Sequence, residues 1–122
     1  LLRDREFGLC LMAGFGGVMT EIYEDVAFRV LPVTRADCED MLSQLRAAPL
    51  LAGFRGQQAD RAALVDLMLQ LNKFAAEWGE HLEGMDLNPV LVHPQGVTIV
   101  DAKMVLRAAP AGEDAPPPVG RP

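Results

Sequence analysis

Four polar side chains near the C-terminal end of the sequence, Asp86, Asn88, Asp101 and Lys103, have the types and spacing that most favour chemistry. Asp86 and Asn88 lead into one run rich in Val, Ile and Leu, and a second such run leads into Asp101 and Lys103; Pro-Gln-Gly joins the two runs. This arrangement is typical of a β-hairpin, because glycine adopts the positive φ that a tight turn needs. We therefore expect a hairpin over residues 85–103 with these four side chains at its open end.

Alternation of side chains along a strand predicts that the four polar residues share one face. If Gln95-Gly96 is a two-residue turn, Val90 pairs with Asp101 and Asn88 pairs with Lys103. A slip of one residue would place Asp101 in the core, so the pattern itself favours this register. The opposite, apolar face is expected to pack in the core; it carries Met85, Leu87, Leu91, Val100, Ala102, Met104 and Leu106.

An Asn carbonyl oxygen beside an Asp carboxylate offers the hard oxygen ligands that Mg²⁺ prefers. Mg²⁺ typically takes one or two protein groups and completes its shell with water and phosphate oxygens. A neighbouring lysine can meet phosphate as a point charge. Asn88, Asp101 and Lys103 therefore predict a platform for a magnesium–nucleotide complex. The alternative is a solvated hairpin end with a local Asp–Lys pair, and spacing alone leaves both open because such surface pairs are common and weak.

The composition limits the classes of protein to which this chain can belong. A chain of 122 residues that is 50% hydrophobic fits one domain or part of one. The net charge of −6 argues against a nucleic-acid surface, and no apolar run approaches the roughly 20 residues that a membrane-spanning helix needs. Cys10 and Cys38 form no Cys-X-X-Cys pattern and indicate reduced thiols of a cytoplasmic protein. The opening lacks both an initiating Met and a signal-peptide pattern, so we expect part of a longer protein.

The elements that must position the hairpin begin after residues 1–8, a polar stretch that ends in a turn. Residues 9–13 form a short apolar run that predicts a buried strand. Gly14-Phe15-Gly16-Gly17 follows; glycines let the backbone approach a phosphate, although most such loops are only turns. Strands at 19–23 and 26–31 are then expected to form a second hairpin.

A first helix is predicted from Thr34, a good N-cap, with Asp37 in the first turn where acids suit the helix dipole. Pro49 is expected to end this helix. Its apolar positions recur with helical spacing and indicate a packing helix; they are Cys38, Met41, Leu42 and Leu45.

Asp60 is expected to cap a second helix, which Gly79 ends. The apolar stripe of this helix, interpreted as core, comprises Leu64, Leu67, Met68, Leu71, Phe74, Ala75 and Trp78. After Arg107 the chain is rich in Pro and Ala, which predicts a disordered tail over residues 108–122.

The order of strand, hairpin, helix, helix and hairpin predicts an α+β domain over residues 1–107. Hairpins favour antiparallel pairing. We therefore expect a mainly antiparallel sheet with two helices packed on one face.

A family resemblance adds to this interpretation. Met-Asp-Leu-Asn-Pro-Val-Leu-Val followed by Val-Asp-Ala-Lys resembles the end of the ATP-grasp domain in NDP-forming acyl-CoA synthetases, relatives of the succinyl-CoA synthetase β subunit. The resemblance implies that Asn88 and Asp101 are the magnesium ligands and that Asp86 faces the migrating phosphoryl group. Many members also have an acid two residues before this position, where the present sequence has Gly84.

A second stretch, Gly-Phe-Gly-Gly-Val-Met-Thr-Glu followed by Asp-Val-Ala-Phe-Arg, resembles another signature of the same family. The resemblance maps Gly16 and Gly17 onto the phosphate-approaching turn. It maps Glu21 and Arg29 onto the family's glutamate and arginine, which makes them candidate catalytic residues together with Asp86. Lys103 and Arg29 would be electrostatic helpers.

The resemblance covers about residues 3–106 and implies the C-terminal subdomain of an ATP-grasp fold. Such enzymes interconvert acyl-CoA, NDP and phosphate with free acid, CoA and NTP, so Mg²⁺ and ATP or ADP are the expected cofactors. The expected partners are an upstream ATP-binding lobe and CoA-ligase domains of the same enzyme, with CoA and a carboxylic acid as substrates and no nucleic acid or membrane. We expect the chain alone to be inactive. The alternatives are a non-catalytic regulatory or scaffold module and a free-standing adaptor.

Overall fold

The computed structural model describes residues 1–15, 25–53 and 58–108. The predicted strand 19–23, the residues Gly16, Gly17 and Glu21, and nearly all of the predicted tail lie outside the described residues. The described elements are β1 (Leu2–Asp4), β2 (Gly8–Gly14), β3 (Val26–Val30), α2 (Arg35–Gln44), α3 (Ala48–Leu51), α4 (Arg61–Trp78), the 3₁₀ helix η2 (Gly79–His81), β4 (Leu82–Leu87), β5 (Val90–Val92), β6 (Val97–Ile99) and β7 (Ala102–Leu106).

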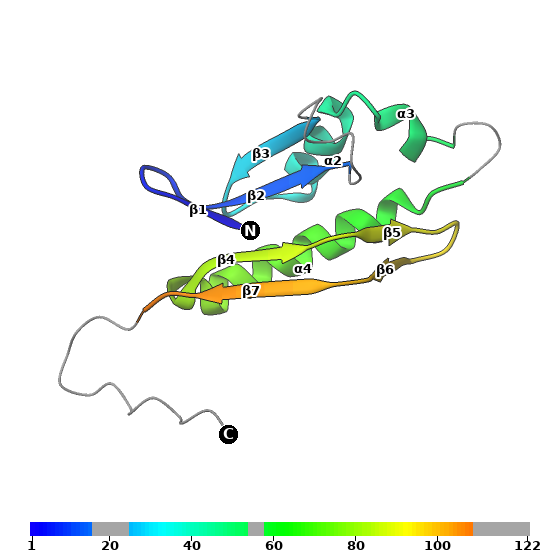
Figure 1. Cartoon of the computed structure of the whole chain (residues 1–122). Helices are drawn as coiled ribbons and strands as arrows, with labels where there is room; N and C mark the ends of the chain where they lie inside the picture. The colour runs from blue at the N-terminus through cyan, green and yellow to red at the C-terminus, as the bar shows by residue number, and fades with distance from the viewer. Residues whose placement is uncertain (16–24, 54–57, 109–122) are drawn as a thin grey trace, which may run out of the picture.

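The strands form an antiparallel sheet in the order β3-β2-β1-β4-β7, and β5 and β6 pair in a separate two-stranded sheet. The N-terminal strands lie with α2 and α3, whereas the β4–β7 hairpin runs along α4 (Figure 1). The predicted α+β class with a mainly antiparallel sheet is therefore confirmed. Within the described ranges, no helix combines the length and hydropathy needed to cross a membrane.

β1 joins the two halves of the sheet and is not predicted by the sequence. Residues 1–8 were predicted to be polar and then to turn, and the turn is present because the Asp4 carboxylate accepts from the Glu6 and Phe7 backbone N–H groups. A strand of three residues has no periodicity to detect. The Arg3 guanidinium donates to the carbonyls of Leu82 and Gly79, and these bonds tie β1 to the start of β4.

Both predicted helices pack on the sheet face that carries Leu11 and Ala27. The buried core comprises Leu11, Ala27, Val33, Cys38, Met41, Leu42, Leu45, Leu51, Val65 and Met68. Trp78 was predicted to be core, but it lies in the last turn of α4, is 53% exposed and stands near the His81 ring. The core is therefore built from the middle of α4 and from the buried face of α2.

The helix caps follow the sequence closely. Thr34 and Asp37 form a capping box at the start of α2. The prediction that Pro49 ends this helix is wrong. The helix ends at Gln44, because Leu45 has extended backbone angles, and Pro49 lies in the first turn of α3. A proline is tolerated there because the first helical N–H groups need no partner within the helix.

Candidate metal and phosphate site

The predicted C-terminal hairpin is present, with β4 and β5 on one arm and β6 and β7 on the other. Its loop closes where the His93 N–H donates to the Gly96 carbonyl at 2.9 Å. Gly96 has φ of 86°, a conformation that favours glycine. The Pro-Gln-Gly link therefore makes the turn that the sequence predicted.

The register of this hairpin differs from the prediction by two residues. Val90 pairs with Ile99, and Asp86 pairs with Lys103. Asn88 lies opposite Asp101, and its N–H donates to the Asp101 carbonyl at 3.0 Å. The predicted pairs Val90–Asp101 and Asn88–Lys103 are wrong, because the turn is centred on residues 94 and 95 and Gly96 follows them.

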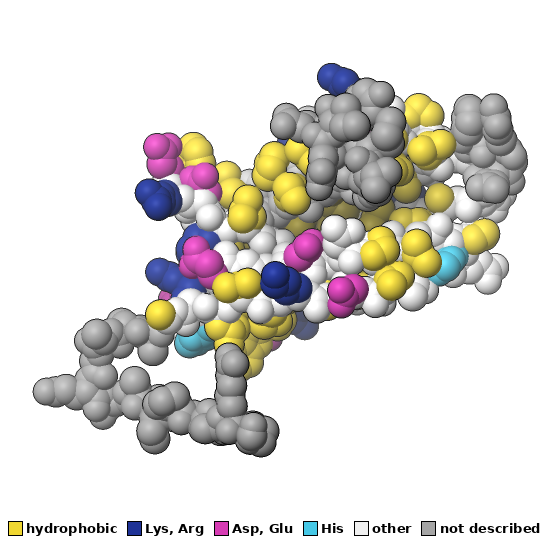
Figure 2. All heavy atoms as spheres, in the orientation of Figure 1, with side chains coloured by type: hydrophobic (Ala, Val, Ile, Leu, Met, Phe, Trp, Pro, Cys, Tyr) yellow, Lys and Arg dark blue, Asp and Glu magenta, His cyan; other side chains and the backbone are white. Residues whose placement is uncertain are grey.

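A shift of two residues keeps the parity of the strands, so the shared face of the four polar residues is retained. The corrected register brings the two predicted metal ligands directly opposite each other. It also makes Asp86 and Lys103 the neighbouring pair on the same face. Figure 2 shows acidic and basic side chains following one another along the β4–β7 hairpin.

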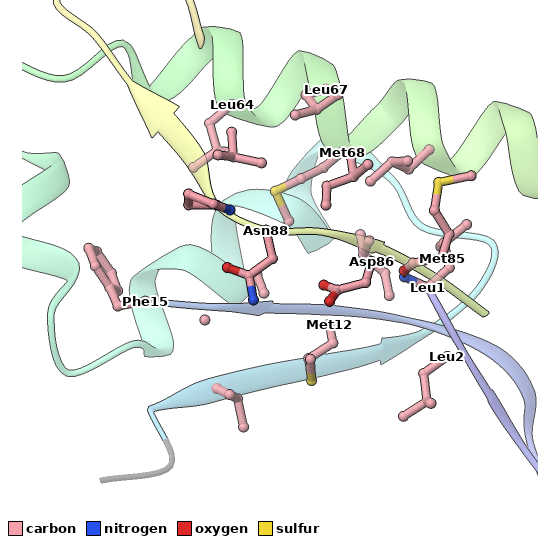
Figure 3. Close-up of a pocket in the computed structure, with 18 of the residues that line it drawn as sticks. Leu1, Leu2, Met12, Phe15, Leu64, Leu67, Met68, Met85, Asp86 and Asn88 are labelled. Carbon is pink, nitrogen blue, oxygen red and sulfur yellow. The ribbon is translucent and has the colours of Figure 1, made fainter. Parts of the chain in front are cut away.

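These side chains stand on the open face of the five-stranded sheet. Leu2 pairs with Cys10 on one side and with Gly84 on the other, so Met12 on β2 and Asp86 on β4 point to the same face. Figure 3 shows Asp86 and Asn88 beside a cavity, with Met12 across from them. The cavity has a volume of about 1000 Å³, and Asp86, Asn88 and Lys103 are among the residues that line it.

The apolar face of the C-terminal hairpin was predicted to pack in the core. The structure confirms this prediction only in part. Met85 and Leu87 are half-buried, whereas Leu91, Val100, Met104 and Leu106 are 47%, 55%, 47% and 65% exposed. Ala102 is also exposed. One reason is that β7 is an edge strand of the sheet. The other is that in the separate β5–β6 sheet Val92, not Leu91, packs against the core.

The donor set at the open end fits a hard divalent cation. One carboxylate oxygen of Asp101 accepts from the Ala102 N–H at 2.9 Å, and the side chains of Asn88 and Asp101 are exposed. Over the described residues, no group of three or more His, Cys, Asp or Glu side chains is placed to hold a metal. Two protein oxygens with phosphate and water in the remaining positions is the arrangement that Mg²⁺ commonly takes.

Lys103 is available for an anion. The ion pairs within the described part of the chain join Arg29 to Asp40, Arg35 to Asp66 and Arg61 to Glu39, and Lys103 is in none of them. An ammonium group on the same face as two carboxylates and an amide can meet a phosphate that also binds the cation.

Asp60 holds the tip of the hairpin against α4, a role that sequence reasoning missed. One carboxylate oxygen caps α4 by accepting from the Ala63 N–H at 3.0 Å, and the other accepts from the Gly96 N–H at 2.7 Å. The Asp60 N–H donates to the His93 carbonyl at 2.7 Å. The Gly96 hydrogen bond, followed by that from Ala63, lowers the pKa of Asp60 below its ordinary value.

Arg29 does not lie with the candidates that the structure describes on the hairpin, which are Asp86, Asn88, Asp101 and Lys103. Its side chain lies on the same face of β3 as Ala27, which is buried beneath the helices, whereas Val26, Phe28 and Val30 are exposed on the other face. Its guanidinium donates to the Gln44 side chain at 3.2 Å and lies 3.7 Å from an Asp40 carboxylate oxygen, both on α2. Its contacts in this chain therefore join β3 to α2.

This architecture is that of an α+β domain, with helices on one face of an antiparallel sheet and a hairpin that presents oxygen and ammonium groups. The chain belongs to the ATP-grasp domain family, which matches residues 1–106. The family resemblance read from the two sequence motifs is confirmed.

The curated relatives are acyl-CoA-forming ligases. The chain is 40% identical over 107 residues to the β subunit of ADP-forming acetate–CoA ligase II from Pyrococcus furiosus, covering 85% of this chain and 45% of that protein. It is 42% identical over 103 residues to ADP-forming acetate–CoA ligase II from Archaeoglobus fulgidus, covering 84% of this chain and 15% of that protein. The chain thus spans less than half the length of these relatives.

A solved structure agrees in fold. An acetyl-coenzyme A synthetase of Ca. Korarchaeum cryptofilum, solved with coenzyme A and Mg-AMPPCP, has a TM-score of 0.81 and 42% identity. The match covers 87% of this chain and 50% of that one. The part matched is therefore nearly all of the described chain and about half of the larger structure.

Proposed function

We propose that this chain is the metal- and nucleotide-phosphate-binding part of an NDP-forming acyl-CoA synthetase. The complete enzyme would convert a carboxylic acid, CoA and a nucleoside triphosphate into acyl-CoA, nucleoside diphosphate and phosphate, and the reverse. Its cofactors would be Mg²⁺ and ATP or ADP, and its partners the upstream ATP-binding lobe and the CoA-ligase domains. The cytoplasm is the proposed compartment, which the two free, buried cysteines favour.

The observation that carries the proposal is the pairing of Asn88 with Asp101 across the hairpin. Two hard oxygen donors, one neutral and one charged, face the same side of a paired backbone, with Asp86 and Lys103 as the next pair. Asn88 directly follows β4 and Asp101 directly precedes β7, so the backbone hydrogen bond between them extends the pairing of these two strands by one residue pair. The relatives are ligases that form ADP, and the Korarchaeum structure holds Mg-AMPPCP.

In this proposal the residues of the chain position and neutralise phosphate. Asn88 and Asp101 would hold Mg²⁺, which when bound offsets charge on the nucleotide phosphates. Lys103 would bind a phosphate oxygen from the same face, and Asp86 would face the group being transferred. The predicted roles of Gly16, Gly17, Glu21 and Arg29 remain part of the proposal for the intact enzyme.

A non-catalytic ATP-grasp-like module is the second candidate, and Gly84 favours it. The family resemblance implies an acid at this position in many members, where this sequence has glycine. A Cβ atom at Gly84 would lie 3.3 Å from the Leu1 carbonyl oxygen, so the local packing suits glycine. A regulatory module of this kind would bind a nucleotide or a protein without needing the metal pair.

Mn²⁺, a paramagnetic substitute for Mg²⁺, tests the proposal by NMR with and without ADP. We expect Mn²⁺ to broaden the amide signals of Asn88 and Asp101 first, with those of Asp86 and Lys103 next. Asn88→Ala and Asp101→Ala should each remove this selective broadening. Glu77→Ala is the matched control, because it removes one exposed charge from the last turn of α4 and leaves the four residues of the proposed site unchanged.

Two results would contradict the proposal. One is broadening that survives in both Asn88→Ala and Asp101→Ala. The other is broadening that spreads evenly over the acidic surface and changes equally in Glu77→Ala. Binding of ADP that is indifferent to Mn²⁺ would instead support the non-catalytic module.

A further inference from the structure

The outer edge of β7 is an exposed length of strand. β7 is the last strand of the five-stranded sheet, and no other described strand pairs with its outer side (Figure 1). All five of its residues are exposed. Because its outward backbone groups have no ladder partner among the described residues, this edge is a template for pairing with another strand.

Hydrogen bonds on the inner side of β7 show which backbone groups point outward. The Asp101 carbonyl accepts from the Asn88 N–H at 3.0 Å, and the Arg107 N–H donates to the His81 carbonyl at 2.9 Å. Odd-numbered residues therefore direct their backbone groups toward β4, and even-numbered residues direct theirs away from it. The residues whose N–H and C=O groups point outward are Ala102, Met104 and Leu106.

We propose that this edge pairs with the same edge of a second copy of the chain, as antiparallel strands related by a two-fold axis at Met104. Met104 would face Met104 of the second copy, and Ala102 and Leu106 would each face the other residue across the axis. Each of these three pairs would exchange two backbone hydrogen bonds, because all of the groups involved point outward. The inference rests on the strand edge and its charges, and it does not depend on the proposed reaction.

The charges along the strand select this register from the others that the outward groups allow. A shift of two residues in one direction would move the axis to Lys103 and bring two lysines face to face. A shift in the other direction would place Lys103 opposite Arg107 of the second copy. With the axis at Met104, Lys103 instead faces Val105, and Asp101 faces Arg107. Like charges directly opposite each other destabilise a pair of strands, whereas opposite charges stabilise it.

Asp101 and Arg107 would form an ion pair at each end of the interface. They would be a non-hydrogen-bonded pair, in which side chains approach most closely. Both residues are exposed, and the Arg107 guanidinium makes only a long contact with the Glu80 carbonyl, at 3.5 Å. One Asp101 oxygen accepts from the Ala102 N–H at 2.9 Å. In the dimer this N–H would donate to the Leu106 carbonyl of the second copy, which would leave the Asp101 oxygen available to Arg107.

The other face of the paired strands would be apolar. Ala102, Met104 and Leu106 are exposed and share the face that lies opposite Lys103. Pairing would place the two Met104 side chains beside each other and each Leu106 beside Ala102 of the second copy. Removal of this apolar surface from water would add to the backbone hydrogen bonds.

The interface would be small, because each copy contributes one strand. Stable interfaces bury about 1,200–2,000 Å² in total, and smaller ones belong to weak or transient complexes. We therefore expect a dissociation constant between about 10 μM and about 1 mM. The same patch is used on both copies, so the assembly closes at two chains.

A charge swap tests the proposal. In sedimentation equilibrium, the average mass should rise above the 13.2 kDa of one chain as the concentration increases through this range. Asp101→Arg and Arg107→Asp should each raise the dissociation constant at least about 10-fold, because each places like charges opposite each other. The double variant restores opposite charges and should return the dissociation constant to within about 3-fold of the original. Arg46→Asp is the control, because it makes the same charge change at an exposed position between α2 and α3.

Hydrogen exchange measured by NMR locates the contact. Exchange at the outward amides of Ala102, Met104 and Leu106 should slow as the concentration rises, whereas the amides of Lys103 and Val105, which face β4, serve as the internal reference.

Three results would overturn the proposal. The first is a mass of one chain at every concentration. The second is a double variant that associates as weakly as the single variants. The third is protection of the outward amides in a monomer, which would mean that another segment of the chain covers the edge. If a single variant fails to fold, as judged by circular dichroism, the double variant and the exchange pattern decide.

Discussion

The Asp60 side chain joins two elements that lie far apart in the sequence. Its carboxylate joins the first turn of α4 to the tip of the hairpin, and the proposed metal and phosphate residues lie further along the same hairpin. Sequence reasoning identified the cap, because an Asp before an apolar helical stripe is a local signal. The bond to Gly96 joins residues 36 positions apart, and no local pattern reports it.

The lowered pKa of Asp60 makes part of the stability pH-dependent. A carboxyl group whose folded pKa lies below its ordinary value of 3.8 stabilises the fold above that value, and the stabilisation is lost as the pH falls through the folded pKa. Asp60→Asn should therefore lower the melting temperature at pH 7 and reduce the loss of stability between about pH 5 and pH 2. Circular dichroism melts across this range measure both effects.

Asparagine can still cap α4, so the change chiefly weakens the bond to Gly96. Glu77→Gln is the control because Glu77 is exposed on the same helix. Asp37, whose pKa is lowered by the Thr34 backbone hydrogen bond and then by its side chain, should retain its own contribution at low pH in both variants. If Asp60→Asn lost as much stability at low pH as the unmodified chain, Asp60 would not be a source of the pH dependence.

Substitution of Arg29 can distinguish a direct role at the proposed metal face from a role in holding β3 against α2. Its contacts with Asp40 and Gln44 join β3 to α2. Arg29→Met should lower the free energy of unfolding by about 1 kcal/mol, as expected for one hydrogen bond and a partly exposed ion pair. The selective Mn²⁺ broadening at Asn88 and Asp101 should remain. Loss of that broadening in a folded Arg29→Met chain would place Arg29 at the metal face after all.

At the scale of elements, the hairpin shows what periodicity can and cannot predict. Alternation identified the face shared by Asp86, Asn88, Asp101 and Lys103, because any shift that preserves the apolar pattern must be an even number of residues. The exact pairs depended on which residues form the turn, and Pro94-Gln95 and Gln95-Gly96 were equally compatible with that pattern. β1 was not predicted because its three residues show no strand pattern of their own. They form a strand because they pair with β2 on one edge and with β4 on the other.

The capping box of α2 is an element whose sequence signal and structure agree, so its energetic weight can be predicted. The Thr34 hydroxyl accepts from the Asp37 N–H at 3.2 Å, and the Asp37 carboxylate accepts from the Thr34 N–H at 2.8 Å. Thr34→Ala should lower the free energy of unfolding by about 1 kcal/mol, measured by urea denaturation. Thr34→Ser should retain most of the stability. Equal losses in the two variants would mean that the hydroxyl is not responsible.

At the scale of the molecule, the sequence predicted the fold class and the buried face of α2, because both follow from local patterns. It did not predict the exposure of Met104 and Leu106, since burial of an edge strand depends on what lies beyond it. Figure 2 shows hydrophobic side chains at the surface over the β5–β6 end of the hairpin. This exposed apolar surface agrees with a chain that spans less than half the length of its relatives.

The same incompleteness predicts that the chain alone does not catalyse acyl-CoA formation. Phosphoryl transfer depends on charges held in position around the phosphates from several sides, and the proposed site would supply one of these sides. A coupled assay for nucleotide-dependent thioester formation should give no signal with the purified chain and a signal with the complete enzyme. Asn88→Ala introduced into the complete enzyme should then lower kcat by at least about 100-fold, as expected for loss of an electrostatic stabiliser of the transition state. Activity of the isolated chain would show that this single face is sufficient, whereas full activity of the Asn88→Ala enzyme would remove the metal pair from the mechanism.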